Sequence, residues 1–417
     1  MSDRRVVLTG LGSVNPLGHS VPEFWSALMA CKSGIRRITK FDTKDFDSQI
    51  GGEVLNWDQA RPDSVDVRDW RHMDPFAQYA YVSAMEAVTD SGLDFQREDP
   101  YRCGVIVGTG IGGLIELEQQ HIRMLEKGPS RMSPFTVPKL MANAASGNIA
   151  LRWGLRGVNF CVVTACASAA HAIGESCRII QRDEADIIIT GGSEAALTPI
   201  GLGSFCALKG LSTRNDEPQR ASRPWDRSRD GFLLAEGAGV IILEELQHAK
   251  KRSANIYAEL VGYGASCDGF HITAPDPDGA GAIHAVKLCL KDAGVSTDQV
   301  DYINAHGTST SLGDLAETRG IKKVFGHHAY DGLLVSSTKS ATGHLLGASG
   351  GVELIASALA IHEGILPPTL NLEDPDDECD LDYIANTPRE KKVDIVLSNS
   401  FGFGGHNGCL LLRRFNG

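Results

Sequence analysis

Short runs of β-branched and other apolar residues recur along the whole chain, and each run ends at a glycine or a small polar turn. They form two series of five. The first series covers residues 6–10, 104–108, 159–164, 186–191 and 239–245, and the second covers residues 256–264, 301–307, 333–338, 394–400 and 409–414. Continuously apolar runs are typical of strands that are buried on both faces of a sheet. Because helical stretches lie between the runs, the pattern predicts an α/β fold.

The two series also resemble each other in sequence. Residues 162–169 (VVTACASA) resemble residues 336–343 (SSTKSATG). Residues 186–193 (DIIITGGS) resemble residues 394–401 (DIVLSNSF). Because the two resemblances occur in the same order, they indicate a duplicated half.

A polar, basic segment (QHAKKRSAN, 247–255) separates the two series and is the expected seam. We therefore expect an N-terminal half over residues 1–252 and a C-terminal half over residues 253–417. The length of 417 residues is compatible with two such units, since domains usually hold about 100–200 residues.

The overall charge excludes several classes of partner. The chain has 40 Lys and Arg residues against 52 Asp and Glu, a formal net charge of −12, whereas nucleic acids and anionic membranes are bound through a positive field. The ten cysteines form no CxxC pairs, which argues against a zinc site or a disulfide framework and predicts a reduced cytoplasmic protein. We expect no membrane-spanning segment and no secretory signal, because no apolar run has the required length.

Three local motifs match known ligand or catalytic patterns but lack their context. GTGIGG (108–113) matches a dinucleotide fingerprint, yet no second strand ending in an acidic residue follows it. GASGG (347–351) matches a hydrolase nucleophile elbow, but Ser349 falls inside the expected helix. The acidic stretch 372–382 lacks the ligand spacing of a calcium loop. We therefore expect a glycine turn beside a buried pocket, a helix and a solvated loop at these places.

Cys166 lies directly after an apolar strand and at the start of a helix rich in small residues (VVTACASAAHAIG, 162–174). The N–H groups of the first turn and the helix dipole are expected to lower the pKa of such a thiol, and small neighbours leave room for a substrate. A buried structural cysteine would fit the same segment. On this segment alone both interpretations stay open.

Three further segments place reactive side chains at strand ends. NAHGTSTSLGD (304–314) puts His306 at the end of a strand. STKSATGHLLGASGG (337–351) puts Lys339 and His344 after another, and a lysine among small residues there requires a partner. SNSFGFGGHNG (398–408) sets two phenylalanines among glycines, where the backbone can approach a ligand closely.

Together these segments resemble the β-ketoacyl-[acyl-carrier-protein] synthases, the condensing enzymes of fatty-acid synthesis, and most closely the type II elongating enzymes. The resemblance runs through the whole chain and includes VTGLGSVNPLG (8–18), RPWDRSRDGFLLAEGAGV (223–240) and FHITAPDPDGAGA (270–282). It implies a thiolase-like fold, in which two similar halves form five α-β-α-β-α layers, and a homodimer. It also implies a decarboxylative Claisen condensation, in which a cysteine-bound acyl chain gains two carbons from malonyl-carrier with release of CO2.

The resemblance assigns a role to each residue of the expected catalytic centre. Cys166 takes the acyl chain as a thioester. The backbone N–H groups of Cys166 and Phe403 form the oxyanion hole, and Phe403 with Phe401 forms the gate. His306 and His344 stabilise the enolate as neutral donors, and Lys339 orients His344.

Further positions match the family's substrate and carrier contacts. The expected pantetheine-binding residues are Thr273, Thr308 and Thr310. The expected acyl-pocket residues are Ile111, Phe205 and, from the partner subunit of the dimer, Thr136. The expected docking residues for the acidic carrier are Arg68, Arg71, Arg131 and Lys209. The expected supporting residues are Glu353, Asn304 and Asn399, which could hold a structural monovalent cation; no other metal and no organic cofactor is expected.

The chain also departs from the family pattern. Thr136 stands where the bacterial enzymes usually have phenylalanine, and this smaller side chain predicts a pocket that accepts long acyl chains. Ser311, Ala235 and His406 are other departures, and none removes a catalytic group. Two alternatives are kept: a polyketide-type ketosynthase with the same site, and a non-catalytic chain-length partner, which would lack the nucleophile.

Overall fold

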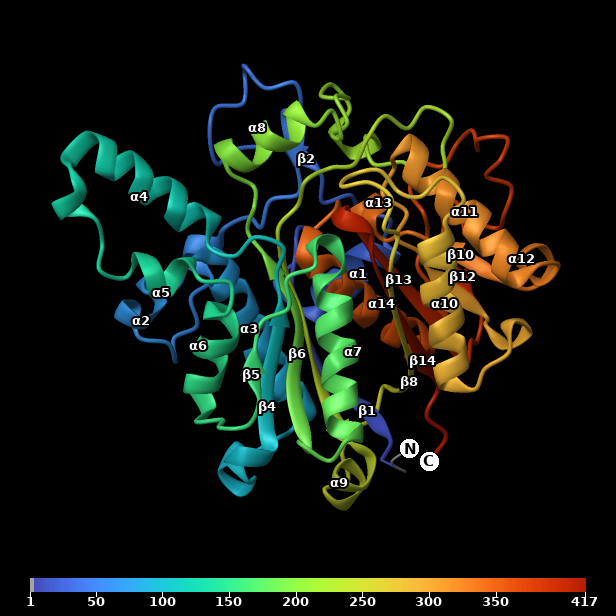
Figure 1. The fold of residues 1–417 in the computed structure, drawn as a ribbon, viewed down its shortest axis with the longest axis horizontal. Helices are drawn as coiled ribbons and strands as arrows, with labels where there is room; N and C mark the ends of the chain where they lie inside the picture. Colours follow the sequence, from blue (N-terminus) through green and yellow to red (C-terminus); the bar gives the residue numbers. More distant parts are fainter. Residues whose placement is uncertain (1–3) are drawn as a thin grey trace.

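The computed structural model describes residues 4–417, apart from the side chain of Asp58. The strands of the first half are β1 (Val6–Val14), β4 (Cys103–Gly108), β5 (Asn159–Phe160), β6 (Ile187–Glu194) and β7 (Gly237–Glu245). The strands of the second half are β8 (Ala258–Cys267), β9 (Tyr302–Asn304), β10 (Leu334–Ser336), β13 (Ile395–Gly402) and β14 (His406–Arg413). All ten form one twisted sheet in the order β10-β9-β13-β14-β8-β1-β7-β6-β4-β5 (Figure 1).

The two halves of this sheet repeat the same topology. In each half the spatial order, starting from the centre, is first, fifth, fourth, second and third strand. The fifth strand pairs antiparallel with the first and the fourth, and the second strand pairs parallel with the fourth and the third. The halves meet through a short antiparallel contact between β1 and β8. The predicted duplication is therefore visible in the strand order.

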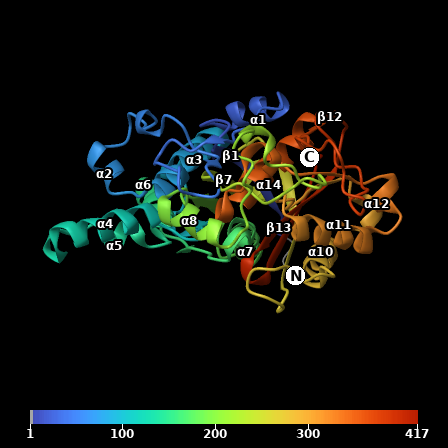
Figure 2. The same cartoon turned by 90° about the horizontal axis from the view of Figure 1, so that it is seen from above.

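Helices complete a five-layered arrangement. Two helices, α7 (Ser168–Gln181) and α14 (Ser349–Glu363), lie between the two halves of the sheet and contact strands of both. The outer face of the first half is covered by α3 (Pro75–Ser91) and α6 (Ala144–Trp153), and that of the second half by α10 (Ala280–Ala293) and α11 (Ser311–Phe325) (Figures 1 and 2). The expected thiolase-like α-β-α-β-α layering is confirmed.

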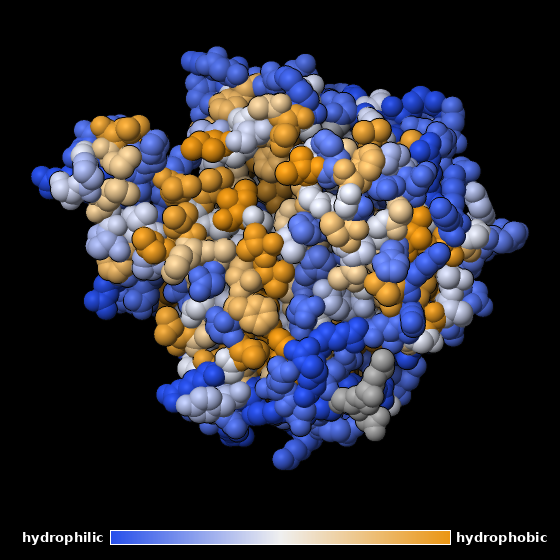
Figure 3. Space-filling view, in the orientation of Figure 1, coloured by the Kyte–Doolittle hydropathy of each residue, from blue (hydrophilic) through white to orange (hydrophobic). Residues whose placement is uncertain are grey.

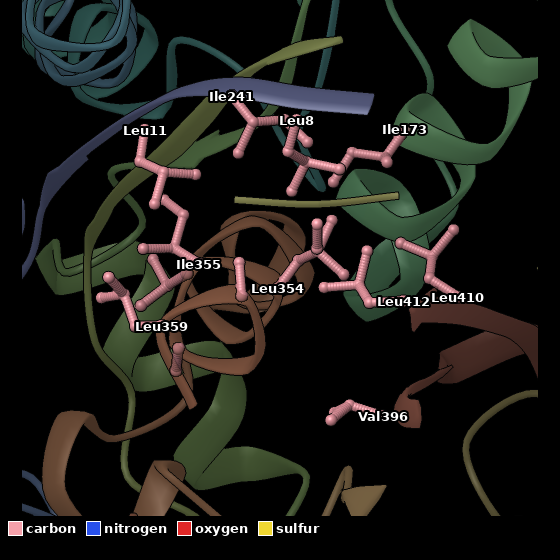
Figure 4. Packing of buried hydrophobic residues seen from close by; sticks show 14 of the residues in the cluster. Leu8, Leu11, Ile173, Ile241, Leu354, Ile355, Leu359, Val396, Leu410 and Leu412 are labelled. Carbon is pink, nitrogen blue, oxygen red and sulfur yellow. The ribbon is translucent and has the colours of Figure 1, made fainter. Parts of the chain in front are cut away.

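The central core lies around α14. Its Leu354, Ile355 and Leu359 belong to one buried cluster with Leu8 of β1 and Leu410 of β14, which lie in different halves (Figure 4). Burial of each such side chain contributes about 1.5–3 kcal/mol of hydrophobic free energy. Glycine permits the close approach, because a Cβ at position 351 would come within 2.3 Å of a β7 carbonyl oxygen. The central layer thus fixes one half against the other.

The two central helices begin in the same way. A three-residue 3₁₀ turn precedes each of them, Ala165–Ala167 before α7 and Leu346–Ala348 before α14. Ala165 has a φ of 49° and Leu346 a φ of 48°, both in the left-handed region. The second residue of each turn is Cys166 in one half and Gly347 in the other. The sequence alignment, which sets Cys166 against Ser340, is therefore out of register at this point.

The remaining elements surround this framework. The helices are α1 (Val21–Met29), α2 (Val67–Arg71), α4 (Leu114–Lys127), α5 (Thr136–Leu140), α8 (Pro199–Ala207), α9 (Leu246–Lys251), α12 (His328–Asp331) and α13 (Lys339–Thr342). Two small sheets pair β2 (Arg36–Arg37) with β3 (Ile50–Gly51) and β11 (Ile365–Leu366) with β12 (Arg389–Glu390). Within residues 4–417, none of the helices has both the length and the apolar character needed to cross a membrane.

The expected seam lies between β7 and β8, where residue 252 follows α9. A buried ionic network holds this region. Glu244 of β7 is fully buried and accepts hydrogen bonds from His248 Nδ1 at 2.6 Å and from Arg252 Nε at 2.7 Å. His248 Nε2 lies 3.0 Å from Glu98 Oε2. The division into independent halves at this point stays a prediction.

This network predicts a pH-dependent stability. The hydrogen bond to Glu244 and the charges of Glu244 and Glu98 raise the pKa of His248 above its usual 6.5, against the effect of burial. The stabilisation is therefore complete below about pH 6.5 and is lost as the pH rises through the raised pKa. We expect His248→Gln to lower the free energy of unfolding by about 1 kcal/mol at pH 6 and by much less at pH 9.

The measurement is urea unfolding of the two proteins at both pH values. His362→Gln is the matched control, because His362 pairs with Glu363 at an exposed position. A penalty for His248→Gln that grows with pH would contradict the assignment.

Candidate active site

Cys166 lies in the turn that leads from β5 into α7, and its side chain is buried. Burial raises the pKa of the Cys166 thiol to about 12, although the charge of Lys339 and the Phe403 N–H act in the opposite direction. The expected lowering of this pKa by the helix start is therefore wrong, because desolvation of the thiolate outweighs it. The thiol is therefore neutral at neutral pH.

Two histidines face each other near this cysteine. His306 follows β9 and His344 follows α13, and their ring centroids are 5.3 Å apart in an edge-to-face arrangement. Burial, together with the positive charge of Lys339, holds the pKa of both rings well below the usual 6.5. Both rings are therefore neutral at neutral pH and can act as N–H donors without carrying charge.

The orientation of His344 is set by Ser349. The hydroxyl of Ser349, the first residue of α14, lies 2.9 Å from His344 Nδ1. The backbone N–H of His344 also donates to the Leu233 carbonyl at 2.7 Å. Sequence patterns do not reveal Ser349, since the GASGG motif around it points to a hydrolase. Its position five residues after His344, at the start of a helix, is the only signal in the sequence.

Lys339 holds His306 rather than His344. Its side chain is almost completely buried, and its ammonium donates to the His306 carbonyl at 2.7 Å and forms an ion pair with Glu353. In the described chain Lys339 makes its hydrogen bonds to these two groups and not to His344. The expected orienting contact with His344 is thus corrected: the lysine supports the backbone of one histidine and places a positive charge near both.

Glu317 fixes the turn that carries His306. Its carboxylate accepts hydrogen bonds from the backbone N–H of His306 at 2.9 Å and of Gly307 at 2.8 Å. The side-chain amide of Asn399 donates to the same carboxylate at 3.1 Å. Glu317 was not a candidate from the sequence, because its link to the histidine depends on how α11 folds back beneath the turn.

A single cavity of about 490 Å³ joins these groups. The predicted catalytic and gate residues that line it are Cys166, His306, His344, Phe401 and Phe403. The predicted substrate contacts that line it are Ile111, Phe205, Thr273, Thr308 and Thr310. Side chains from both halves of the fold therefore meet in one cavity, with the thiol and both imidazoles on its wall.

Two family models match most of the chain. A model described as "Beta-ketoacyl synthase, N-terminal domain" matches residues 3–249, and one described as "Beta-ketoacyl synthase, C-terminal domain" matches residues 257–373. The chain belongs to the β-ketoacyl synthase family.

Curated relatives of this β-ketoacyl synthase cover its full length. A protein named 3-oxoacyl-[acyl-carrier-protein] synthase 2 from Coxiella burnetii is 51% identical over 414 residues, which are 99% of each chain. Proteins of the same name from Synechocystis and Staphylococcus aureus are 49% and 45% identical, and the matches span 99% or more of this chain and 99% of each relative.

Solved structures of ketosynthases share the fold. One contains the acyl-carrier protein of a type II polyketide synthase in complex with its ketosynthase bound to the hexaketide. The matched chain is 34% identical with a TM-score of 0.92, and the match covers 99% of this synthase and all of that chain. A β-ketoacyl synthase from Burkholderia phymatum is 34% identical with a TM-score of 0.91, at the same coverage.

Other predicted residues of the synthase lie outside the cavity. Thr136 begins α5, and its hydroxyl donates to the Ser133 carbonyl at 2.8 Å and to Glu116 Oε1 at 3.2 Å. Arg68 and Arg71 are on α2, which approaches the start of α5 through a stacked contact between His72 and Phe135, with ring centroids 3.7 Å apart.

The two remaining docking candidates lie on other segments. Arg131 lies in the 3₁₀ turn between α4 and α5. Lys209 lies at the cavity and pairs with Asp47 at 2.7 Å.

Two departures from the family pattern contact the site. Ala235 is fully buried, and its N–H donates to the His344 carbonyl at 3.0 Å. Ser311 begins α11 and lines the cavity. The third, His406, begins β14, next to the glycines that follow Phe403.

Proposed function

We propose that this β-ketoacyl synthase elongates acyl chains by decarboxylative Claisen condensation, in which an acyl group on Cys166 reacts with malonyl-carrier. The observation that carries the proposal is the meeting of one buried thiol and two neutral imidazoles in a single cavity. The 45–51% identity to proteins named 3-oxoacyl-[acyl-carrier-protein] synthase 2 supports the fatty-acid substrate class.

In the first half-reaction the Cys166 sulfur attacks the thioester carbonyl of the acyl-carrier. The carrier's sulfur leaves, and the proton of the Cys166 thiol passes to it, so that one thioester replaces another. The N–H groups of Cys166 and Phe403 stabilise the oxyanion. The Phe403 N–H acts to lower the pKa of the Cys166 thiol in the resting structure, and in this proposal it donates to the oxyanion during the reaction.

In the second half-reaction malonyl-carrier loses its carboxylate as CO2. The electron pair of the broken C–C bond forms an enolate, whose oxygen accepts hydrogen bonds from His306 and His344. The enolate carbon then attacks the acyl carbonyl on Cys166 and releases the thiolate. Because burial raises the pKa of this thiol to about 12, the thiolate takes a proton and the neutral resting state returns.

The two alternatives are weighed on separate observations. A polyketide ketosynthase would use the same cavity, and the compared polyketide structure is 34% identical, against 45–51% for the fatty-acid relatives named above. The higher identity favours fatty-acid elongation. A non-catalytic chain-length partner would lack the nucleophile, whereas Cys166 and both histidines line the cavity.

A direct assay tests the function. The purified protein is incubated with octanoyl-carrier and malonyl-carrier, and both CO2 and the carrier-bound product are quantified by mass spectrometry. We expect equal amounts of CO2 and of a 3-oxo product that is two carbons longer. Release of CO2 without an elongated product would contradict the condensation.

We propose that carrier docking uses Arg68, Arg71, Arg131 and Lys209. The net charge of −12 repels an acidic carrier, so docking requires a local positive patch. We expect the double variant Arg68→Glu and Arg71→Glu to raise the KM for carrier-bound substrates about tenfold or more at low salt, with little change for acyl-CoA.

Kinetics with the two substrate forms measure this effect. Lys323→Glu and Lys391→Glu, together on the second half, provide the matched double control. Equal changes in KM for carrier-bound and CoA-bound substrates would contradict the docking assignment.

We propose that the synthase is a homodimer, joined through β5 and its surroundings. β5 is the last strand of the sheet, and Phe160 on it is 40% exposed. Exposed apolar side chains continue onto the neighbouring helices, with Leu151 on α6 and Leu117 on α4, and apolar residues gather on this side of the molecule (Figure 3). Such an edge favours pairing with a second copy of itself.

Phe160→Asp tests this interface. A charge buried on each side of a twofold axis costs several kcal/mol. We therefore expect the dissociation constant of the dimer to rise by about 100-fold or more. Light scattering coupled to gel filtration measures the mass at several concentrations. Tyr330→Asp on α12, also at an exposed aromatic position, is the control. A monomeric wild type, or a dimer unaffected by Phe160→Asp, would contradict the proposal.

In such a dimer, Thr136 would close the acyl pocket of the partner subunit. Its hydroxyl is occupied within its own chain by Ser133 and Glu116, so the methyl group is left for the partner. The prediction of a pocket for long acyl chains rests on this smaller side chain.

The monovalent cation also stays a proposal. Asn304 Oδ1 and Glu353 Oε2 are buried and find no hydrogen-bond partner among residues 4–417, and such oxygens suit a hard cation. Asn399 fits less well, because Cys409 and Glu317 already contact its amide. The described chain contains no cluster of three His, Cys, Asp or Glu residues that could bind another metal.

A further inference from the structure

Glu194, the last residue of β6, carries a fully buried carboxylate that the mechanism does not use. Its Oε1 accepts hydrogen bonds from Thr109 Oγ1 at 3.0 Å and from Ile111 N at 3.2 Å. Its Oε2 accepts from Gly110 N at 2.6 Å and from Gly347 N at 3.1 Å. The four donors are neutral, and burial raises the pKa of Glu194 to about 7. Burying a carboxylate without a positively charged partner costs free energy, so a specific role for Glu194 is expected.

The four donors come from two turns that belong to different halves of the fold. Thr109, Gly110 and Ile111 form the turn after β4, and Ile111 lines the acyl end of the cavity. Gly347 belongs to the second half and lies three residues after His344. Gly347 packs directly on the turn after β4, because a Cβ at Gly347 would come within 2.2 Å of Gly110 N and 2.8 Å of Glu194 Oε2. The carboxylate therefore joins the acyl wall to the turn that follows a catalytic histidine.

The internal duplication allows Glu194 to be compared with the equivalent position in the other half of the fold. Gly347 is the structural counterpart of Cys166 at the start of the other central helix. Extending the alignment of residues 186–193 with 394–401 by one position sets Glu194 against Gly402. A Cβ at Gly402 would lie 3.0 Å from Cys166 N. Gly402 thus leaves the helix-start N–H of Cys166 open, whereas Glu194 occupies the equivalent N–H of Gly347.

We propose that Glu194 is a positioning residue for acyl transfer: its carboxylate holds the Ile111 wall at a fixed place relative to the turn after His344, and so sets which acyl chains reach Cys166. The proposal rests on the acyl-transfer function proposed above. It assigns to Glu194 an effect on chain selectivity in addition to its effect on stability.

Glu194→Gln separates these two effects. The amide of the new glutamine has one oxygen that can accept hydrogen bonds. If its NH2 group turns toward Thr109, whose hydroxyl can accept, the amide oxygen still accepts from the N–H groups of Gly110 and Gly347. The Ile111 N–H then loses its acceptor, so the acyl wall is released while the link to Gly347 remains. Glu194→Asp, which is one methylene shorter, is expected to lose its contact with one of the two turns.

The experiment measures the initial rates of Cys166 acylation from octanoyl-carrier and hexadecanoyl-carrier by intact-mass spectrometry. We expect Glu194→Gln to change the ratio of the two rates by about five- to tenfold, the effect of losing one ordinary hydrogen bond. Decarboxylation of malonyl-carrier should stay within about twofold of wild type, because His306 and His344 keep their contacts. Thr109→Val removes the hydroxyl that donates to Glu194 Oε1, the oxygen that also accepts from the Ile111 N–H. This variant should change the ratio of the two rates in the same direction.

Glu244→Gln is the matched control, since Glu244 is a fully buried carboxylate at the seam between the halves. This control variant should lower the melting temperature and leave the ratio of the two acylation rates at the wild-type value. The proposal is overturned if Glu194→Gln and Thr109→Val keep the wild-type ratio, or if Glu194→Gln slows both chains equally, as loss of stability alone would do. An unacylated wild type would instead contradict the proposed function itself.

Discussion

Replacing Cys166 with alanine is expected to abolish condensation and to leave decarboxylation in place. The 3-oxo product requires an acyl chain on the sulfur, so its formation should fall by about 10⁴-fold or more. Decarboxylation of malonyl-carrier requires only the cavity and the two neutral imidazoles, which the substitution leaves intact. Parallel measurement of CO2 and of the carrier-bound product separates the two steps.

Cys161→Ala is the control for this experiment. Cys161 is a second, partly buried cysteine five residues earlier, outside the residues that line the cavity. The variant should condense at close to the wild-type rate. An elongated product from Cys166→Ala at a comparable rate would remove the covalent step from the mechanism.

Replacing His344 with alanine should have the opposite effect on the two half-reactions. The enolate loses one of two hydrogen-bond donors in a buried site, so we expect decarboxylation and condensation to fall by about 10²- to 10³-fold. Acylation of Cys166 should continue, because it depends on the thiol and on backbone N–H groups. Single-turnover mass spectrometry of the acyl-enzyme and a CO2 assay give the two rates.

Two further variants sharpen this prediction. Ser349→Ala removes the group that orients the His344 ring, and it should reduce decarboxylation by a smaller factor, about tenfold. His327→Ala is the control, since His327 lies at an exposed position on the second half. If His344→Ala blocked acylation and left decarboxylation unchanged, the assignment of this residue to the enolate would be wrong.

The framework and the reactive side chains could be predicted from the sequence because they depend on local patterns. Continuously apolar runs identify the strands, and their two similar series predict the repeated strand order. His306 lies just after a strand, and Cys166 and His344 lie in the segments that follow two other strands. Such segments converge on one side of an α/β sheet. The cavity that these three residues share was therefore expected.

The groups that hold the reactive residues could not be predicted in the same way. Lys339 contacts the His306 carbonyl, although it is nearer in sequence to His344. Glu317 and Glu194 reach backbone N–H groups of distant turns. The Lys339 and Glu317 contacts depend on how helices of the second half pack against its strands, and the Glu194 contact depends on how the two halves pack together. No local spacing in the sequence records either arrangement.

Burial also makes the pKa of the Cys166 thiol differ from the value expected from the sequence. The start of a helix favours a thiolate, but the position of Cys166 between the two halves removes water from the sulfur and raises its pKa to about 12. The alignment of Cys166 with Ser340 failed for a related reason. The helix start, rather than the short sequence match, identifies Gly347 as its counterpart.

Intact-mass spectrometry after exposure to a panel of acyl-carriers tests the central claim most directly. The account predicts a thioester adduct on the wild type for each accepted chain, with hexadecanoyl transfer at least as extensive as octanoyl transfer, and loss of every adduct in Cys166→Ala. A wild type that carries no adduct, or an adduct that persists in Cys166→Ala, would contradict it.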